Sequence, residues 1–458
     1  MKGIEKIYFV GIGGIGMSAL ARWFKASGCV VAGYDRTPTA LTNQLTDEGI
    51  DIHFDDDVNL IPADFKEKKG TLVVFTPAVP SEHSELVYFL NQGFEVKKRS
   101  EVLGMITKNH PSIAVAGTHG KTTTTSMIAH VLKYANVDCV AFLGGITQNY
   151  NTNLLLNSGP NPWVVVEADE YDRSFLRLNP KVAVVTTMDA DHLDIYDNEG
   201  EFIKAFNEFA DQIEEGGSLV HREGLALKSS SIGVLIETFG SGAATYKVSN
   251  VKADHGWFVF DLETPQKKII GARMQVPGMH NVMNALAAWA CGRIVGISDE
   301  VIAEAIENFK GVKRRFEYHI KGQRIIYIDD YAHHPTEIEA CLDAVRMLYP
   351  GKHITVAFQP HLFSRTRDFM EGFVHSLSKA DGVVLLDIYP AREKPLEGIT
   401  SEVLLQKISA ANKQLVTKEE LPSVLARLQT DVVVTMGAGD IDKLVEPVKL
   451  KLEEVYEI

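Results

Sequence analysis

The chain has 458 residues, of which 45% are hydrophobic and 23% charged, and it carries a formal net charge of −14. This length exceeds one ordinary domain and predicts roughly two to four, while the acidic balance excludes a general affinity for nucleic acid. No apolar run reaches the roughly 18 residues of a membrane span, and the first residues lack the apolar core of a signal peptide. The four cysteines lie far apart without a CxxC pair, which argues against a zinc site and predicts a reducing, cytoplasmic location with no membrane partner.

Short apolar runs alternate with helical patterns over the first hundred residues. Strands are predicted at residues 6–10, 29–34 and 71–76, and a helix at residues 16–27. This alternation is typical of βαβ units with a parallel sheet, so a Rossmann-like domain is expected over residues 1–107.

Two further α/β regions follow, with predicted boundaries near residues 107 and 313. Residues 108–312 hold a strand, a helix, two more buried strands, a β-hairpin region and a closing helix, at 112–116, 121–134, 163–166, 182–186, 216–275 and 281–295. Residues 313–458 hold strands at 324–328, 354–358, 382–386 and 431–435. The prediction is a three-domain α/β fold with Rossmann-like terminal domains and a central P-loop ATPase-type domain, which combines a parallel sheet with a small β-rich part.

The first glycine-rich loop follows the first predicted strand and opens a helix. Its GxGxxG spacing is formed by Gly11, Gly13, Gly14 and Gly16. Such a loop allows close backbone approach to a diphosphate, and Asp35 at the end of the next strand is placed to meet a ribose hydroxyl. The motif does not separate NAD from another diphosphate nucleotide, so a dehydrogenase is an alternative at this point.

The second glycine-rich loop resembles a P-loop. Its residues are Gly117, Thr118, His119, Gly120, Lys121, Thr122 and Thr123. It departs from GxxxxGK[ST] because Val115 stands at the position of the first glycine. Backbone N–H groups can still cradle phosphates, Lys121 can neutralise charge, and the Thr122 hydroxyl can hold Mg²⁺. A dehydrogenase has no use for this loop, which therefore indicates ATP and phosphoryl transfer.

Acidic and polar residues follow several later strands. Glu167 ends a buried strand and is well placed to bind Mg²⁺, and His192 follows another strand. Their acidic neighbours allow a simpler interpretation as a solvated rim: Asp169, Glu170, Asp172, Asp191 and Asp194. Asn281 and Asn284 share one face of a helix, where an asparagine can pair with adenine or merely cap the helix.

Six spaced motifs together resemble the Mur ligase family of peptidoglycan synthesis over essentially the whole chain. They are residues 117–123 (GTHGKTT), 167–170 (EADE), 191–194 (DHLD), 280–284 (HNVMN), 314–316 (RRF) and 330–335 (DYAHHP). The resemblance implies a UDP-substrate domain at residues 1–107, an ATP-binding domain at 108–312 and an amino-acid-binding domain at 313–458.

The resemblance also implies residue roles. Lys121, Glu167, His192 and Arg315 would be catalytic, and the glycines of the first loop would bind a UDP-linked substrate. The metal, Mg²⁺ with Mn²⁺ as an alternative, would be held by Thr122, Glu167 and His192. Asn281 would contact adenine with support from Asn284, and Asp330 would bind ribose.

Local detail favours one member of the family. Other amino-acid-adding ligases carry a modified lysine where this chain has Phe206 and Asn207. That difference implies addition of L-alanine to UDP-N-acetylmuramate through an acyl phosphate, with glycine and L-serine left open. Residues 359–368 resemble the amino-acid-binding segment, where Arg365 would hold the carboxylate beside Tyr331 and His333. Many relatives have arginine where this chain has Leu362.

Three alternatives accompany this expectation. One is a recycling ligase of the same family that attaches a preformed murein tripeptide. The others are an NAD-linked dehydrogenase and a nucleotide-regulated binding protein without chemistry. The expected partners are small molecules, and the expected assembly is a monomer or a weak homodimer.

Overall fold

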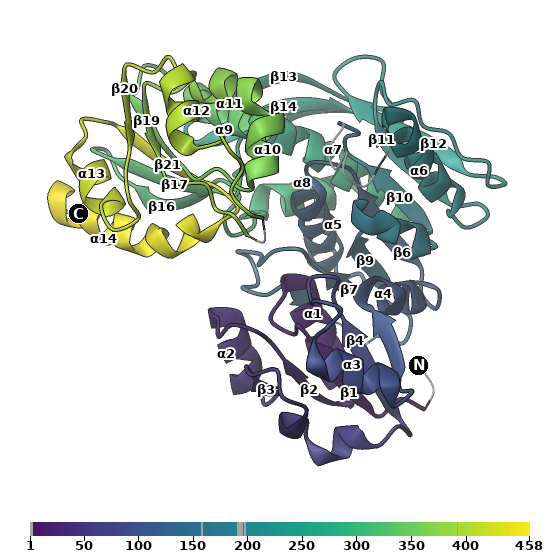
Figure 1. Ribbon diagram of the computed structural model, residues 1–458. Coiled ribbons are helices and arrows are strands. Elements are labelled where there is room, and N and C mark those ends of the chain that lie inside the picture. The colour runs from purple at the N-terminus through teal and green to yellow at the C-terminus, as the bar shows by residue number, and fades with distance from the viewer. Residues whose placement is uncertain (1–2, 157–158, 190–195, 197, 392) are drawn as a thin grey trace. The chain divides into compact units, whose positions relative to one another are not determined.

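The computed structural model describes residues 3–156, 159–189, 196, 198–391 and 393–458 (Figure 1). The chain divides into two compact units. One comprises Met1–Val248, Leu262–Ile269 and Met283–Glu307, and the other Ser249–Asp261, Ile270–Val282 and Asn308–Ile458.

The N-terminal part of the first unit is a five-stranded sheet in the order β3-β2-β1-β4-β5. All its pairings are parallel. The strands are β1 (Lys6–Val10), β2 (Val30–Tyr34), β3 (Asp51–His53), β4 (Thr71–Phe75) and β5 (Glu95–Lys98). The helices are α1 (Ile15–Ala26), α2 (Ala40–Asp47), α3 (Ser84–Asn91) and α4 (Arg99–Thr107), with single 3₁₀ turns η1 (Val58–Leu60) and η2 (Ala63–Lys66). This is the predicted Rossmann-like arrangement.

Side-chain alternation along β1 explains why helices cover both faces of this sheet. Ile7 and Phe9 face a core that includes residues of α1 and α4. Tyr8 and Val10 face a second core that includes residues of α3 and η2. Successive side chains of a strand point to opposite faces, so a strand that is apolar on both needs a layer on each side.

The central sheet has ten strands in the order β15-β14-β13-β12-β11-β10-β6-β9-β7-β8. Its strands are β6 (Ser112–Ala116), β7 (Cys139–Phe142), β8 (Leu154–Leu155), β9 (Trp163–Glu167), β10 (Val182–Val185), β11 (Ser218–Arg222), β12 (Leu235–Gly240), β13 (Tyr246–Asp254), β14 (Trp257–Glu263) and β15 (Lys268–Met274). The helices of this region are α5 (Lys121–Tyr134), α6 (Glu199–Asp211), α7 (Met279–Val295) and α8 (Asp299–Asn308), and η3 is a 3₁₀ segment (Tyr171–Arg177).

One prediction for this region is wrong in part. Residues 216–275 were expected to form β-hairpins, yet β11 pairs parallel with β10 and β12 pairs parallel with β11. The long connection between β11 and β12 allows a crossover, which a parallel pair requires. The connections β13–β14 and β14–β15 have two and four residues, lengths that suit hairpins.

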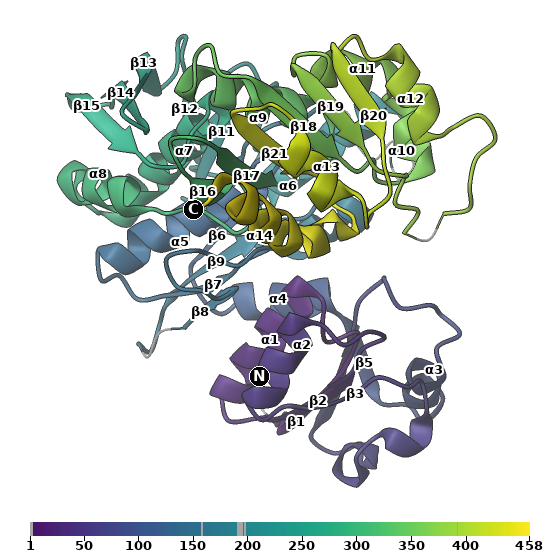
Figure 2. The same ribbon diagram turned by 90° about the vertical axis from the view of Figure 1, so that its left-hand side faces the viewer.

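The C-terminal sheet of the second unit has six strands in the order β16-β17-β21-β18-β19-β20 (Figure 2). These are β16 (Glu317–Lys321), β17 (Ile326–Asp330), β18 (Ile354–Phe358), β19 (Gly382–Leu385), β20 (Asn412–Leu415) and β21 (Val432–Met436). The pairing of β16 with β17 is antiparallel and the others are parallel.

Helices cover both faces of this C-terminal sheet. Residues of α9 (Pro335–Leu348), α11 (Met370–Leu377) and α12 (Ser401–Lys407) contribute to one core, and those of α13 (Leu421–Arg427) and α14 (Val445–Tyr456) to the other. The remaining elements are α10 (Phe363–Asp368) and η4 (Asp440–Leu444).

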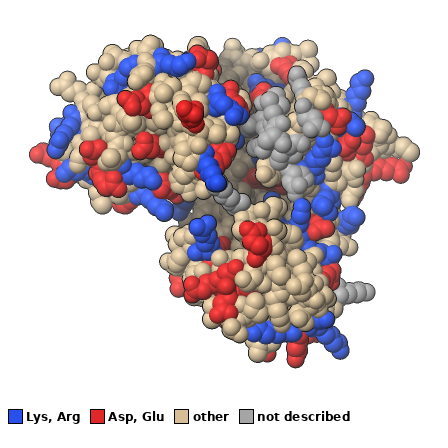
Figure 3. All heavy atoms as spheres, viewed as in Figure 1, with Lys and Arg blue, Asp and Glu red and all other residues tan. Residues whose placement is uncertain are grey.

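Acidic and basic side chains are interspersed on the face drawn in Figure 3. Among the helices described here, none combines the length and the apolar character needed to cross a membrane.

Candidate active site

The first glycine loop lies between β1 and α1. Gly11 has a φ of +89°, and a Cβ atom there would come within 2.8 Å of Thr76 Cγ2. The N–H of Gly13 donates to Asp35 Oδ2 at 2.7 Å. Asp35 therefore braces the loop itself, and its contact with a ribose stays a prediction. Gly14 precedes the first turn of α1, so N–H groups of that turn are available to a phosphate.

The second glycine loop connects β6 to α5 and is supported by the end of β10. Gly117 has a φ of +130°, and a Cβ atom there would lie 2.2 Å from Thr186 Oγ1. The N–H of His119 donates to Thr187 Oγ1 at 2.9 Å, and the hydroxyls of Thr118 and Thr187 are 2.8 Å apart. Thr186 and Thr187 were not identified from sequence. The feature that could have identified them is their position directly after β10, the strand that pairs with β6.

Lys121 is held at the base of this loop by Glu170. Its Nζ atom lies 2.8 Å from both carboxylate oxygens of Glu170 and 2.7 Å from the Gly117 carbonyl oxygen. Glu170 is 0% exposed, which excludes the alternative interpretation of this residue as part of a solvated rim. Burial opposes the charged ammonium most strongly, but the combined attraction of Glu170, Asp169 and Glu167 outweighs it and raises the pKa of Lys121. Lys121 is thus positively charged at neutral pH.

Thr122 and Glu167 meet where β6 and β9 end. These strands are parallel neighbours, with Val115 opposite Glu167. The Thr122 hydroxyl donates to Glu167 Oε2 at 3.3 Å, and the N–H of Gly144 donates to Oε1 at 2.7 Å. Burial raises the pKa of Glu167. Gly144 was not identified from the sequence. The structure shows that glycine leaves room for the carboxylate at this position, because an added Cβ atom would lie 2.3 Å from Glu167 Oε1.

A carboxylate beside a hydroxyl is a donor set that suits Mg²⁺, which prefers oxygen ligands. His192, the third predicted metal ligand, lies outside the described residues. Within the described ranges, no group of three His, Cys, Asp or Glu side chains could hold a metal ion. The three-residue metal set therefore stays a prediction.

The two asparagines of α7 have different surroundings. A Cβ atom on Gly120 would lie 2.8 Å from Asn284 Oδ1, which places the buried Asn284 directly against the second glycine loop. The amide nitrogen of Asn281, in the first turn of α7, donates to the Pro277 carbonyl oxygen at 2.7 Å. This bond is not an N-cap, in which a side-chain oxygen accepts a backbone N–H, and the contact of Asn281 with adenine stays a prediction.

In the second unit, two adjacent arginines lie over one tyrosine ring. Arg315 is 4.8 Å and Arg314 5.2 Å from the centre of the Tyr331 ring. Arg314 also bonds Asp329 at 3.0 Å and the Gly437 carbonyl oxygen at 2.7 Å. These bonds give Arg314 a structural role, whereas Arg315 is 4.0 Å from its acidic neighbour Glu337.

Asp330 is the last residue of β17 and His333 follows the strand, both near these arginines. Asp330 accepts the N–H groups of Phe316 and Ala332 at 2.8 and 2.7 Å, and burial raises its pKa to about 6. His333 Nδ1 is 3.0 Å from the Tyr331 carbonyl oxygen and 3.2 Å from Glu337 Oε2. Burial lowers the pKa of His333, with Arg365 acting in the same direction.

The predicted amino-acid-binding segment follows β18 and includes α10. The ring centres of His361 and His333 are 6.3 Å apart. Burial, His333 and Arg365 together lower the pKa of His361 to about 4. Leu362 has a φ of +69°, a strained value for a leucine. Arg367 pairs with the adjacent Asp368 at 2.7 Å. The ring centres of Tyr331 and His333 are 5.3 Å apart, and the role of Arg365 in binding the amino-acid carboxylate stays a prediction.

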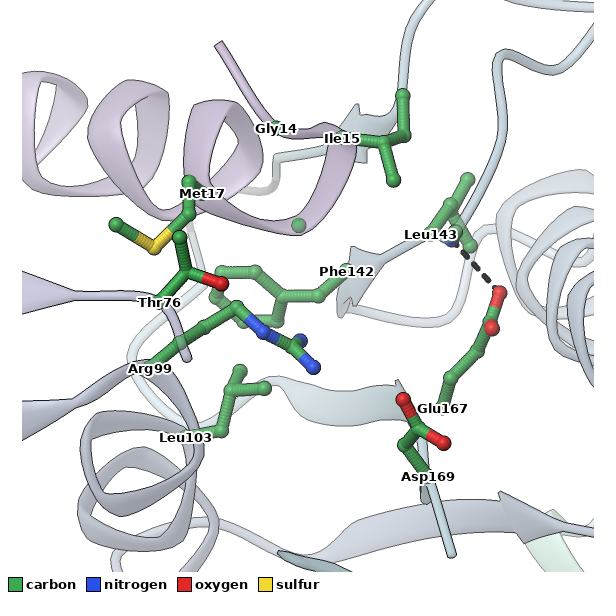
Figure 4. Close-up of a pocket in the computed structure, with 12 residues that line it drawn as sticks. Gly14, Ile15, Met17, Thr76, Arg99, Leu103, Phe142, Leu143, Glu167 and Asp169 are labelled. Carbon is green, nitrogen blue, oxygen red and sulfur yellow. Dashed lines mark hydrogen bonds between the residues drawn. The ribbon is translucent and has the colours of Figure 1, made fainter. Parts of the chain in front are cut away.

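A pocket of about 300 Å³ connects the first glycine loop with Glu167 in the first unit (Figure 4). Gly14, Ile15, Gly16 and Met17 come from the start of α1, and Glu167 and Asp169 from the end of β9. The other lining residues are Thr76, Arg99, Leu103, Phe142, Leu143 and Gly144.

Comparison with known protein families matches nearly the whole chain. The Mur ligase family catalytic domain matches residues 6–111, the Mur ligase middle domain residues 115–292, and the Mur ligase glutamate ligase domain residues 314–439.

Individual proteins agree with these matches. A UDP-N-acetylmuramate–L-alanine ligase of Cytophaga hutchinsonii is 50% identical over 99% of this chain and 98% of its own length. One from Flavobacterium johnsoniae is 51% identical over 98% of each chain. The crystal structure of the UDP-N-acetylmuramate–alanine ligase of Thermotoga maritima aligns over 99% of both chains with a TM-score of 0.82 and 30% identity. A murein peptide ligase of Psychrobacter arcticus shares the fold, with a TM-score of 0.71 and 23% identity.

The two glycine loops, the Lys121, Thr122 and Glu167 grouping and the relatives that match over nearly the full length lead to one conclusion. The chain belongs to the Mur ligase family.

Proposed function

We propose that this protein catalyses the ATP-dependent ligation of L-alanine to UDP-N-acetylmuramate, the first amino-acid addition in peptidoglycan precursor synthesis. The observation that carries the proposal is the grouping of Lys121, Thr122 and Glu167 at the carboxyl ends of two adjacent parallel strands. Two relatives with about 50% sequence identity over 98–99% of this chain are named UDP-N-acetylmuramate–L-alanine ligases, which supports the same substrates for this protein.

The proposed first step transfers the γ-phosphoryl group of ATP to the lactyl carboxylate. The backbone of residues 117–123 cradles the phosphates, and Lys121 leaves Glu170 to contact them. Thr122 and Glu167, together with His192, would hold Mg²⁺ or alternatively Mn²⁺. A bound divalent ion supplies positive charge that stabilises the phosphoryl oxygens. The carboxylate attacks the γ-phosphorus, ADP leaves and an acyl phosphate remains.

The proposed second step forms the amide. Arg365 binds the carboxylate of L-alanine with a two-pronged contact, and Tyr331 and His333 complete the amino-acid site. The neutral amine attacks the acyl carbon, phosphate leaves, and the nitrogen loses one proton to the departing phosphate. Arg315, with Asn281, Asn284 and Asp330, binds ATP. Three-domain organisation with boundaries near residues 107 and 313, a cytoplasmic location and a monomeric or weakly dimeric state belong to the same proposal.

A phosphate-release assay tests this function. Purified protein with UDP-N-acetylmuramate, ATP and Mg²⁺ is expected to release phosphate when L-alanine is added. Glycine, L-serine and the murein tripeptide, each offered in place of L-alanine, rank the amine substrates. A higher kcat/KM with the tripeptide would replace the proposal by the recycling activity. Equal phosphate release without any amine, or no release with all of them, would overturn it.

A further inference from the structure

The pocket between the first glycine loop and Glu167 contains one cation, Arg99. Arg99 is the first residue of α4, and Figure 4 shows its guanidinium group extending into the pocket. Arg99 is partly buried. Its guanidinium nitrogens lie close to Gly16, where an added Cβ atom would be 2.9 Å from Nη1. The glycine at position 16 therefore leaves room for this arginine.

Nearby carboxylates already have other partners. Glu101 accepts the N–H of Lys98 at 2.7 Å and pairs with Arg177 at 3.1 Å. Glu167 accepts hydrogen bonds from Thr122 and Gly144. Within the described part of the chain, Arg99 has no hydrogen bond or ion pair with another residue. A partly buried guanidinium without a protein partner is ready to bind an anion, because its five donors form strong, charge-assisted bonds.

We propose that Arg99 binds the diphosphate of the UDP-linked substrate, an inference that rests on the proposed function. One observation favours the diphosphate over the lactyl carboxylate. The guanidinium lies against Gly16 in the first turn of α1, where the free N–H groups also favour a phosphate.

The experiment compares three uridine nucleotides by isothermal titration calorimetry. UDP and UDP-N-acetylglucosamine carry the diphosphate without the lactyl carboxylate, and UDP-N-acetylmuramate carries both. Arg99→Ala is expected to weaken all three by a similar factor of about 10 to 100, the size of a charge-assisted contact. Arg99→Lys keeps the charge but loses the two-pronged geometry, so an intermediate loss is expected.

Arg222→Ala is the matched control. It removes the same charge from an exposed position on β11, and binding is expected to change less than about twofold, since isolated surface charges contribute little. Thermal unfolding is measured for every variant, and Arg99→Lys serves as the test if Arg99→Ala does not fold.

Two results would overturn the inference. UDP could bind the Arg99 variants as tightly as the wild type, or the loss could appear with UDP-N-acetylmuramate alone, which would assign Arg99 to the carboxylate. Failure of the proposed function has a different signature, because the wild-type protein would then fail to bind UDP-N-acetylmuramate or to release phosphate with any amine.

Discussion

Gly144→Ala is the substitution for which the structure makes the sharpest prediction. The added Cβ atom would lie 2.3 Å from Oε1 and 2.5 Å from Oε2 of Glu167. Ordinary contact begins near 3.4 Å, so the carboxylate must move by about 1 Å. A displacement of that size at a reacting centre costs about 100-fold in rate. We therefore expect kcat to fall about 100-fold.

This loss is expected without unfolding. Gly144 is exposed and its φ lies outside the left-handed region, so alanine is compatible with the backbone there. Phosphate release measures kcat, and thermal unfolding monitored by circular dichroism measures stability. We expect the unfolding midpoint of Gly144→Ala to match that of the wild type.

Gly28→Ala is the control with the opposite signature. Gly28 has a φ of +89° and nothing within 4 Å of an added Cβ atom. Alanine there is strained by about 1 kcal/mol but does not approach the site. We expect a lower unfolding midpoint with unchanged kcat. A wild-type kcat for Gly144→Ala would refute the placement of Glu167 at the reacting centre.

Three further predictions follow from the same structure. Lys121→Ala is expected to abolish phosphate release while leaving the calorimetric affinity for UDP-N-acetylmuramate unchanged, because Lys121 belongs to the second glycine loop. Removal of divalent ions with EDTA is expected to stop turnover, and added Mg²⁺ or Mn²⁺ to restore it; activity that persists in EDTA would contradict the metal set. Glu85 is fully buried beside Tyr8 and His53, and burial raises its pKa from 4.5 to about 7. The native state thus favours the protonated form of Glu85. The stability that Glu85 contributes to the folded protein is fully present below pH 4.5 and is lost as the pH rises through about 7. Glu85→Gln should therefore exceed the wild type in free energy of unfolding at pH 8 by about 2–3 kcal/mol, and an equal advantage at pH 4, measured by urea unfolding, would argue against this.

Patterns among a few neighbouring residues were sufficient to predict much of the fold from the sequence. Apolar runs predicted several strands in each of the three sheets, among them β1, β6 and β18, because a strand buried on both faces needs continuous apolar residues. Short, partly exposed strands such as β3, β5 and β20 lack such a run and were not predicted. The loop at residues 117–123 could be assigned to phosphate binding because its backbone conformation and its lysine are encoded in one contiguous segment.

The tertiary structure decided which distant residues support that segment. Glu170 is 49 residues from Lys121, and Gly144 is 23 residues from Glu167. Local periodicity carries no information on such partners, since they depend on which strands become neighbours in the sheet. The same limit explains the parallel pairing of β11 and β12, where a short apolar segment fits a hairpin and a parallel strand equally well. The residue types of the site and its two glycine loops could be identified from the sequence alone. Three features arise only when the β-strands assemble: the burial of Glu170, the space that Gly144 leaves for Glu167, and the position of Arg99 against Gly16.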